Sequence, residues 1–386
     1  MKKFFIGFSV AAVSSLTLAQ APQAANAKGL KLTLKTSEPF IQKGQLKLEI
    51  IQKSFLLEPK ELSANNKITA KLSQKLESIF KGINRVGKDA RFENEKGSWV
   101  ARQRSAWQVN QAQTRENILK AIESGAATAE ISLDVTTPKR NVRNWAESGI
   151  TTLFAKGSSS FKGSPSFRVK NIIVAASKLD NDYLEESQEL DFNDSIGAIN
   201  KATGFVEGFV IVDGTLEKED GGGICQVSTT LFRAAYNGGL PITERHEHSH
   251  RVSYYDPVGF EATVYAPSKN LKFKNDSGGT LLIQAEWNEK AQTLGFFFFG
   301  RAPNRQVSVS APVISDFKAA AAPSFSADPK MRLGASRQID SPMQGMTSLI
   351  IRTIRKDGKV SKDTLKSVYQ PWGAVYAVHP NDQRLR

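Results

Sequence analysis

The sequence predicts an α+β protein in which a helix with Cys225 at its N-terminus packs on a mostly antiparallel sheet. Two observations carry this prediction. The stretch "GGGICQVSTTLFRAAYNGG" places apolar residues at helical spacing directly after three glycines. Residues 254–299 then read as a run of short strands separated by turn residues, which is typical of an antiparallel sheet. A smaller α+β domain before these residues and a β-rich tail after them complete the expected architecture.

The composition is that of a globular protein with more than one domain. The chain has 386 residues, of which 40% are hydrophobic and 23% charged, so two or three domains can each bury a core. The formal net charge of +14 favours anionic partners. The sequence has no run of five or more Lys or Arg residues and no nucleic-acid-binding motif, so we do not expect nucleic acid as a partner.

The first residues predict export from the cytoplasm. "MKKFFIGFSVAAVSSLTLAQAPQAANAKG" has two lysines, an apolar stretch and then small residues. The segment from Ala25 to Ala27 fits an A-x-A cleavage site, so residues 1–27 are interpreted as a secretory signal peptide. No later segment is apolar enough to span a bilayer. The expected location is therefore the periplasm or the cell wall, without stable membrane insertion after cleavage.

Residues 28–150 are predicted to form the small α+β domain. "LKLTLKT" alternates leucine with polar residues, the pattern of a half-buried strand. "TRENILKAIESG" predicts a short helix that Thr114 caps and that ends at Gly125, a position suited to a left-handed C-cap. "EISLDVTTP" predicts a strand that Pro138 ends. Between the first strand and this short helix, "ITAKLSQKLESIFKGIN" predicts a longer helix with an expected apolar face of Leu72, Leu76, Ile79, Phe80 and Ile83.

A second domain is predicted over residues 168–302, after a Gly/Ser-rich linker or long loop at 151–167. "RVKNIIVAASKL" predicts a helix, and "GFVEGFVIVDGTLE" predicts a hairpin that turns at Asp213 and Gly214. The four phenylalanines of "TLGFFFFG" predict a strand buried on both faces. Residues 303–386 are expected to open with an Ala/Ser-rich linker and to end in a hairpin whose strands meet at Asp357 and Gly358.

Cys225 is the only cysteine, so it cannot form a disulfide within the chain. It is a buried bystander, an intermolecular linker or a reactive thiol. The N-terminus of a helix favours the third role, because its unpaired N–H groups and its dipole stabilise a thiolate. The N–H groups of Cys225 and Gln226 are candidate donors for an oxyanion hole, with Gly223 as a backbone contact beside them. The glycines would let a substrate come close to the backbone.

Three histidines follow the helix in "ITERHEHSHRVSYY". Alternation along a strand would place His246, His248 and His250 on one face. A Cys–His catalytic pair is the preferred interpretation, because a histidine supplies the base that a thiol nucleophile needs. A metal site made of Cys225 and the histidines is an alternative, although the spacing matches no standard zinc finger. A purely structural cluster is the other. No metal and no cofactor are expected.

The same residues resemble a known family. "GGGICQVSTTLF" and "GLPITERHEHSHRVSYYDPVGFEATV" closely resemble the core signature of the VanW family. "LDFNDSIG" and "SPSFRVKNIIVAASKLD" resemble segments further upstream in that family. Residues of about 60–145 are more weakly similar to the peptidoglycan-binding domain that often precedes VanW domains.

The resemblance implies a function in the bacterial envelope. Some members of the family are L,D-transpeptidases that cross-link diaminopimelate residues of peptidoglycan stem peptides, with the motif cysteine as nucleophile. Carried over by position, Cys225 is the nucleophile, and His248 and His246 match the motif histidines. Glu261 stands where the family usually has the Asp that would orient the histidine. The positions expected to bind the stem peptide are Arg245, Ser249, Tyr254, Arg168 and Asn171.

The expected mechanism begins with attack of the Cys225 thiolate on the stem-peptide carbonyl that precedes the terminal D-alanine. The side-chain amine of a second stem then receives the acyl group. If water reaches the acyl-enzyme first, the same site is a carboxypeptidase. A cysteine peptidoglycan hydrolase and a non-catalytic wall-binding protein linked to antibiotic response are the alternative functions.

Overall fold

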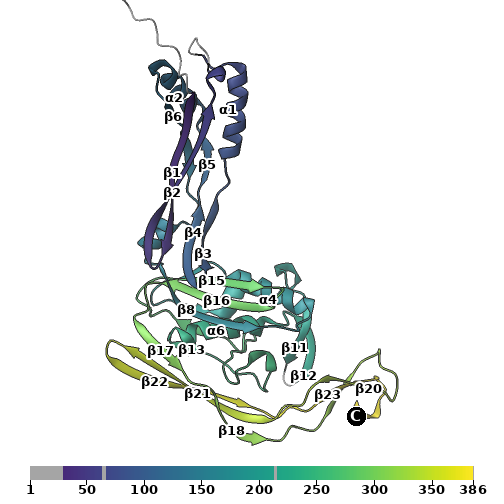
Figure 1. The fold of residues 1–386 in the computed structure, drawn as a ribbon. Coiled ribbons are helices and arrows are strands. Elements are labelled where there is room, and N and C mark those ends of the chain that lie inside the picture. Colours follow the sequence, from purple (N-terminus) through teal and green to yellow (C-terminus); the bar gives the residue numbers. More distant parts are fainter. Residues whose placement is uncertain (1–28, 63–66, 213–214, 386) are drawn as a thin grey trace, which may run out of the picture. The chain divides into compact units, whose positions relative to one another are not determined.

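The structure is a computed structural model that describes residues 29–62, 67–212 and 215–385 (Figure 1). The expected signal peptide and the expected turn at Asp213 and Gly214 lie outside the described residues. The chain divides into two units. The first consists of the residues up to Pro39, Leu48–Ala90 and Gln103–Lys139, and the second of Phe40–Lys47, Arg91–Arg102 and Arg140–Arg386.

A mixed α+β architecture with mostly antiparallel sheets is confirmed. Strands β1 and β4 pair antiparallel, β6 pairs parallel with β1, and the sheet order is β2-β1-β4-β3. A separate pair is formed by β5 and β7. The elements of this part of the chain are β1 (Leu30–Gln42), β2 (Gln45–Leu57), α1 (Ala70–Ile83), β3 (Lys88–Glu95), β4 (Ser98–Arg104), β5 (Ala106–Val109), α2 (Gln111–Ser124), β6 (Thr128–Glu130) and β7 (Leu133–Thr136).

The predicted helices of the first unit are both present, with one corrected cap. Helix α1 buries Leu72, Leu76, Phe80 and Ile83, as its apolar periodicity predicts. Helix α2 ends at Gly125, whose φ of 67° is left-handed as expected. Its N-cap is Asn110 and not Thr114, because the helix begins a full turn earlier. Thr114 is fully buried, and its hydroxyl accepts a hydrogen bond from the Ser132 N–H.

The second unit contains the Cys225 helix and its sheet. The antiparallel sheet has the order β8-β16-β15-β9, and a smaller antiparallel sheet has the order β10-β14-β13. Strands β11 and β12 form the predicted hairpin. The elements are α3 (Val142–Glu147), β8 (Thr152–Ser160), α4 (Ser166–Leu179), β9 (Asp182–Leu184), β10 (Glu189–Asp191), α5 (Phe192–Ile196), β11 (Glu207–Val212), β12 (Thr215–Asp220), α6 (Ile224–Asn237), β13 (Ile242–Glu244), β14 (Lys272–Lys274), β15 (Leu281–Asn288) and β16 (Thr293–Gly300).

The tail is β-rich, as predicted, and is part of the second unit. Its long hairpin β21–β22 turns at Asp357 and Gly358, which confirms that prediction. The expected linker after residue 303 carries strands instead, because β17 and β18 both pair with β21. The strands are β17 (Arg305–Val309), β18 (Val313–Lys318), β19 (Ser324–Ala327), β20 (Ser336–Asp340), β21 (Gly345–Lys356), β22 (Lys359–Tyr369) and β23 (Val375–Val378). Short 3-10 helices are η1 (Pro59–Glu61), η2 (Lys201–Thr203), η3 (Ser253–Tyr255) and η4 (Gln383–Leu385).

The segment predicted as a linker at 151–167 is largely the strand β8, on which helix α6 packs (Figure 1). Its small residues are explained by that contact. A Cβ on Gly157 would lie 2.3 Å from both Ala234 N and Thr230 O of α6. The Ser159 hydroxyl lies 2.6 Å from the Thr230 hydroxyl. Gly and Ser are therefore selected here for close approach of helix and strand rather than for flexibility.

Gly157→Ala is expected to destabilise the second unit. The added methyl would overlap helix backbone, which has no rotamer to escape to, so the free energy of unfolding should fall by about 1–3 kcal/mol or more. Urea unfolding measures the change. The matched control is Gly82→Ala on α1, where a Cβ meets nothing within 4 Å. Helix propensity predicts that this control is about 1 kcal/mol more stable than the parent, so equal effects of both variants would contradict the packing argument.

The core of the second unit lies between the sheet and its helices. Phe296, Phe298 and Phe299 of β16 are fully buried, which confirms the prediction of a strand covered on both faces. Phe297 is half-buried and lies against Trp99, with ring centroids 4.7 Å apart.

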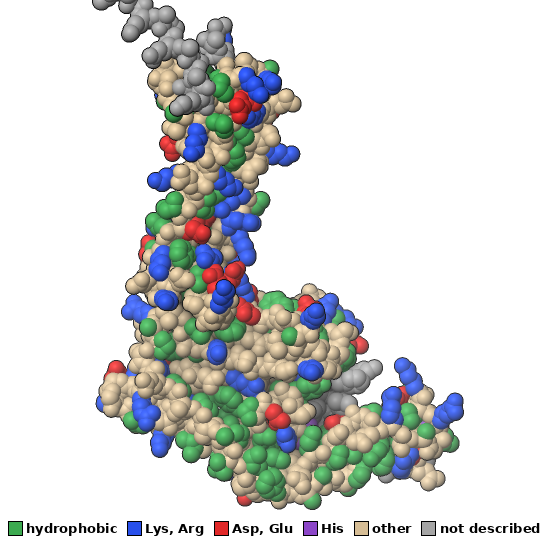
Figure 2. Space-filling view, in the orientation of Figure 1, with side chains coloured by type: hydrophobic (Ala, Val, Ile, Leu, Met, Phe, Trp, Pro, Cys, Tyr) green, Lys and Arg blue, Asp and Glu red, His purple; other side chains and the backbone are tan. Residues whose placement is uncertain are grey.

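On the face shown in Figure 2, Lys and Arg side chains are distributed over the surface rather than gathered in one patch. None of the helices within the described residues has the length and apolar character that crossing a membrane requires.

Candidate active site

Helix α6 begins at a glycine turn that holds Cys225 in its first turn. Gly221 and Gly223 have φ angles of 93° and 115°, a left-handed region that favours glycine. Gly223 is the N-cap, and a Cβ there would lie 2.9 Å from the Arg168 Cγ atom. The prediction that the helix starts next to Cys225 and that Gly238 caps its end is confirmed.

Asn171 holds this glycine turn in place. Its side-chain amide donates to the carbonyls of Val206 and Gly222, and its side-chain oxygen accepts from the Val206 N–H. The side chain is fully buried. The expectation that Asn171 binds substrate is therefore corrected, because its hydrogen-bonding groups are committed to backbone that positions the Cys225 turn.

The Cys225 side chain is half-buried and lies beside Thr263 and Val264, in a segment that pairs with His246. Sγ lies 3.4 Å from the Thr263 hydroxyl and 3.6 Å from the Val264 carbonyl oxygen. Thr263 N–H in turn donates to the His246 carbonyl, in an isolated antiparallel bridge. This bridge brings the chain on either side of the histidines next to the start of α6.

The three histidines do not share one face, which corrects the strand-alternation prediction. Strand β13 ends at Glu244, and the residues after it form only the single bridge at His246. His248 Nδ1 lies 2.9 Å from Glu261 Oε2, whereas His246 Nε2 lies 3.0 Å from Glu244 Oε1. His250 is buried and stacks on Trp372 with ring centroids 4.1 Å apart. Of the three, His248 is the one that interacts with the Cys225 sulfur.

Cys225, His248 and Glu261 form a chain of charge interactions in a nearly dry environment. The exposed fractions of the His248 and Glu261 side chains are 13% and 3%. Burial opposes ionisation of the thiol, but the hydrogen bond and the positive charge of His248 outweigh it and lower the pKa of Cys225 to about 7. Burial also opposes the charge on His248, but Glu261 and the sulfur raise the pKa of the imidazole to about 9. Between these values a thiolate faces an imidazolium.

The remaining partners fix the imidazole and the carboxylate. The Tyr255 ring is buried and stacks on His248, with centroids 4.6 Å apart and planes 17° from parallel. Burial alone would raise the pKa of Glu261, but His248 and a hydrogen bond from Tyr369 hold it below its usual value. The Nδ1 atom of His248 faces Glu261, so Nε2 is the ring nitrogen left for the thiol. This is the arrangement in which a carboxylate orients a base and the base activates a nucleophile.

Arg245 and Arg168, expected to bind a carboxylate of the stem peptide, are structural. Arg245 has a side-chain exposure of 5% and donates to the carbonyls of Glu261 and Gly259 and to the Ser367 hydroxyl. Arg168 is buried and donates to the Ser164 hydroxyl and the Gln226 amide oxygen. Their guanidinium groups are occupied by the protein itself, which corrects both predictions.

Of the two N–H groups predicted to form an oxyanion hole, those of Cys225 and Gln226, only that of Cys225 remains a candidate donor. Gln226 N–H donates to the Gly223 carbonyl at 3.0 Å, and Ile224 N–H donates to the Gly221 carbonyl at 3.1 Å. These turn bonds leave the Cys225 N–H as the first-turn donor. Gly223 contributes through its conformation and its carbonyl, and Gln226 through its buried side chain. Tyr254 and Ser249 remain at the surface, where a ligand can reach them, and the Arg168 guanidinium lies 4.2 Å from the Tyr254 ring.

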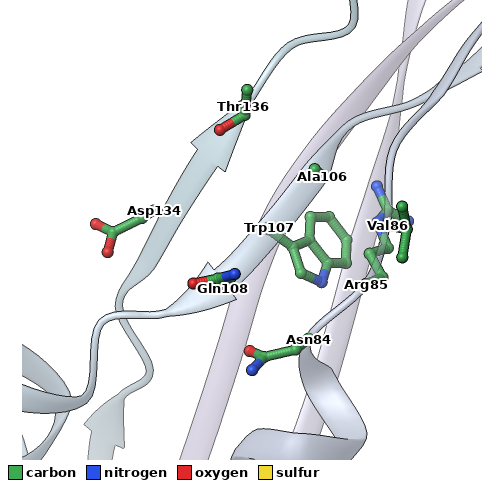
Figure 3. A pocket seen from close by; sticks show the side chains of 8 residues that line it. All are labelled: Asn84, Arg85, Val86, Ala106, Trp107, Gln108, Asp134 and Thr136. Carbon is green, nitrogen blue, oxygen red and sulfur yellow. The ribbon is translucent and has the colours of Figure 1, made fainter.

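Two cavities lie elsewhere, and Cys225 lines neither. One of about 520 Å³ is in the first unit, where Trp107 and Arg85 stack with Asn84, Gln108 and Asp134 around them (Figure 3). The other, of about 460 Å³, lies between the β13 region and strand β22, beside Arg245. Among the residues that the structure describes, no group of three or more His, Cys, Asp or Glu side chains is arranged to hold a metal ion.

Three contributors to the site were missed by the sequence reasoning. Tyr255 is the buried tyrosine of "VSYY", whereas the sequence predicts a functional role only for its exposed neighbour Tyr254. Thr263 follows the acid by two residues, a spacing that carries no chemical signal of its own. Tyr369 lies 108 residues after Glu261 in the chain, so no local pattern connects the two.

The part of the chain that holds the site is similar to known proteins. Residues 167–297 match the family model described as "VanW like protein". The chain is 36% identical over 126 residues to "Uncharacterized protein YoaR" of Bacillus subtilis, covering 33% of this chain and 41% of that protein. It is 26% identical over 141 residues to "Vancomycin B-type resistance protein VanW" of Enterococcus faecalis, covering 35% of this chain and 50% of that protein. The chain thus spans half of the length of these relatives or less.

A solved structure, titled "Crystal structure of HP0197-G5", also aligns with part of the chain. The alignment covers 19% of this chain and 96% of that one, at 16% identity and a TM-score of 0.11. The peptidoglycan-binding character of the first unit stays a prediction.

Proposed function

We propose that the VanW-like domain formed by residues 167–297 is a cysteine acyltransferase of the L,D-transpeptidase type, acting on peptidoglycan stem peptides. One observation carries the proposal. The lone thiol of the chain sits at a helix N-terminus and interacts with His248, whose other ring nitrogen lies 2.9 Å from Glu261. A structural cysteine needs none of these partners, whereas a nucleophile needs all of them.

The first half of the proposed reaction forms an acyl-enzyme. The Cys225 thiolate attacks the carbonyl carbon that precedes the terminal D-alanine of a tetrapeptide stem, and a carbon–sulfur bond forms. The Cys225 N–H is placed to stabilise the negative charge that develops on the carbonyl oxygen. The His248 imidazolium gives its proton to the departing amine, the amide bond breaks and D-alanine leaves. Glu261 keeps the imidazole in the tautomer and orientation that this transfer requires.

The second half transfers the acyl group to an amine. The side-chain amine of a second stem attacks the thioester, neutral His248 takes the proton, and the thiolate is released as the new amide forms. Water in place of the amine gives a shortened stem, so the same residues support a carboxypeptidase. The choice depends on whether the acceptor excludes water from the thioester.

The substrate and the location rest on the family resemblance and on the sequence. Stem peptides carry carboxylates, and the chain has a net charge of +14. The relative from Enterococcus faecalis is named a vancomycin resistance protein, which supports an envelope role for this chain. The proposed location is outside the cytoplasmic membrane, in keeping with the expected signal peptide.

The reaction is tested by incubating the full chain with a disaccharide-tetrapeptide and analysing the products by tandem mass spectrometry. A cross-linked dimer with loss of one D-alanine is expected. A substrate whose acceptor amine is acetylated serves as the control, because it can form the acyl-enzyme but not the dimer. Loss of D-alanine without a dimer from the unmodified substrate would establish the hydrolase instead. Unchanged substrate with a folded protein would contradict both.

A further inference from the structure

We propose that Tyr369, in the tail beyond the VanW-like domain, is a positioning residue that holds Glu261 in the orientation His248 requires. This inference rests on the proposed function, since it assigns Tyr369 to the same site. The family match ends at residue 297 and includes Cys225, His248 and Glu261. The buried Glu261 carboxylate therefore has all of its partners only when strand β22 of the tail is present.

The contacts of Tyr369 are specific to the Glu261 segment. Its ring is 2% exposed, and its hydroxyl donates to Glu261 Oε1 at 2.7 Å. The same hydroxyl accepts a hydrogen bond from the Gly259 N–H at 3.0 Å. Glu261 thus divides its oxygens, with Oε2 on His248 and Oε1 on Tyr369. A carboxylate held at both oxygens cannot rotate away from the imidazole without breaking a charge-assisted hydrogen bond.

The residues around Tyr369 hold the histidine segment as well. Ser367 lies on the same buried face of β22 and accepts from Arg245, the residue before His246. Gln370 N–H donates to the Ser249 carbonyl at 2.7 Å. Trp372 stacks on His250 with planes 14° from parallel. Residues 367–372 therefore contact the chain on both sides of His248, in a region where strand β13 has already ended.

Loss of the Tyr369 hydroxyl would leave a buried carboxylate oxygen and the Gly259 N–H without this partner. Without the Tyr369 hydroxyl the Glu261 carboxylate can turn away from His248, and a carboxylate turned away stabilises the imidazolium less. A less stable imidazolium in turn favours the thiolate less. The effect should therefore be visible at the sulfur. The other titratable groups that face this cluster are Arg233, Arg245, His250 and Tyr255, with Arg168 beside Tyr255 and Asp340 beside His250.

The test is the pH dependence of iodoacetamide alkylation in the full chain, where Cys225 is the only thiol. In Tyr369→Phe the pH at which the alkylation rate reaches half of its alkaline plateau is expected to rise by about one unit. Below that pH, the rate divided by the plateau rate should then be about tenfold lower than in the parent. The matched control is Tyr376→Phe on β23 of the same tail, which should leave the midpoint unchanged. Circular dichroism checks that both variants are folded.

The outcomes separate this inference from the proposed function. The proposed function stands if the parent has an alkylation midpoint near pH 7 and this midpoint rises in Glu261→Gln. If the midpoint of folded Tyr369→Phe is then the same as that of the parent, the inference about Tyr369 is overturned. A parent midpoint at the ordinary value of a thiol would instead contradict the function. If Tyr369→Phe does not fold, Ser367→Ala loosens the same strand at Arg245, and its midpoint should move in the same direction. No shift in that variant would overturn the inference.

Discussion

Cys225→Ala is expected to abolish both the cross-linked dimer and the release of D-alanine. The proposed reaction needs a thioester, and alanine offers no atom that can form one. The rate should fall by at least about 1000-fold, to what the rest of the site contributes without a nucleophile. Product formation from the disaccharide-tetrapeptide, followed by mass spectrometry, measures the loss.

The control for this variant is Ser228→Ala, one turn further along α6. The Ser228 hydroxyl is buried and donates to the Ala262 carbonyl at 2.7 Å, so it faces the protein rather than a substrate. Its removal should leave the dimer in place. Dimer formation by Cys225→Ala, or its disappearance in folded Ser228→Ala alone, would mean that the nucleophile has been assigned to the wrong side chain.

His248→Gln is expected to have the second largest effect. Loss of the base should lower the rate of dimer formation by about 100- to 10,000-fold. It should also raise the pKa of Cys225 from about 7 to the ordinary value of a thiol or above, because the imidazolium that favours the thiolate is gone while the burial that opposes it remains. Alkylation by iodoacetamide across the pH range reports this second change without any substrate.

The sign of the pH dependence follows from the two groups. The thiolate appears as the pH rises through about 7, and the imidazolium is lost as the pH rises through about 9. The parent should therefore be most active between these values, with a bell-shaped profile that belongs to the pair. In His248→Gln the acid limb should move to higher pH.

His246→Gln is the matched control for that experiment. The His246 side chain is 38% exposed and its ring lies against Glu244, so it should leave the alkylation midpoint near that of the parent. The sequence matched both histidines to the family motif, and the structure separates them by their partners. A midpoint shift in His246→Gln, with none in His248→Gln, would exchange their roles.

Some of this site could be predicted from the sequence, because the responsible signals are local. The glycine turn, the apolar periodicity after it and the lone thiol together predict a cysteine at a helix N-terminus, where α6 has it. The turn residues of the tail predict the hairpin β21–β22 in the same way. Each signal depends on residues within one or two turns of each other.

The rest depends on tertiary contacts that no local pattern encodes. Gly/Ser composition predicted a linker where Gly157 instead allows α6 to approach β8. The alternation of histidines predicted a strand that β13 does not continue, because side-chain partners such as Glu261 and Trp372 hold the segment instead. Arg245 is a surface residue by type, yet the tail buries it. A partner as distant in the chain as Tyr369 becomes visible only in the folded protein.

The central claim is that Cys225 accepts an acyl group from a stem peptide, and intact mass spectrometry of the full chain tests it most directly. After mixing with the disaccharide-tetrapeptide and rapid acid quenching, we predict an added mass equal to the substrate less one alanine, mapped to Cys225 and absent in Cys225→Ala. A folded protein that shows no such adduct, and whose thiol alkylates with an ordinary midpoint, would contradict the account.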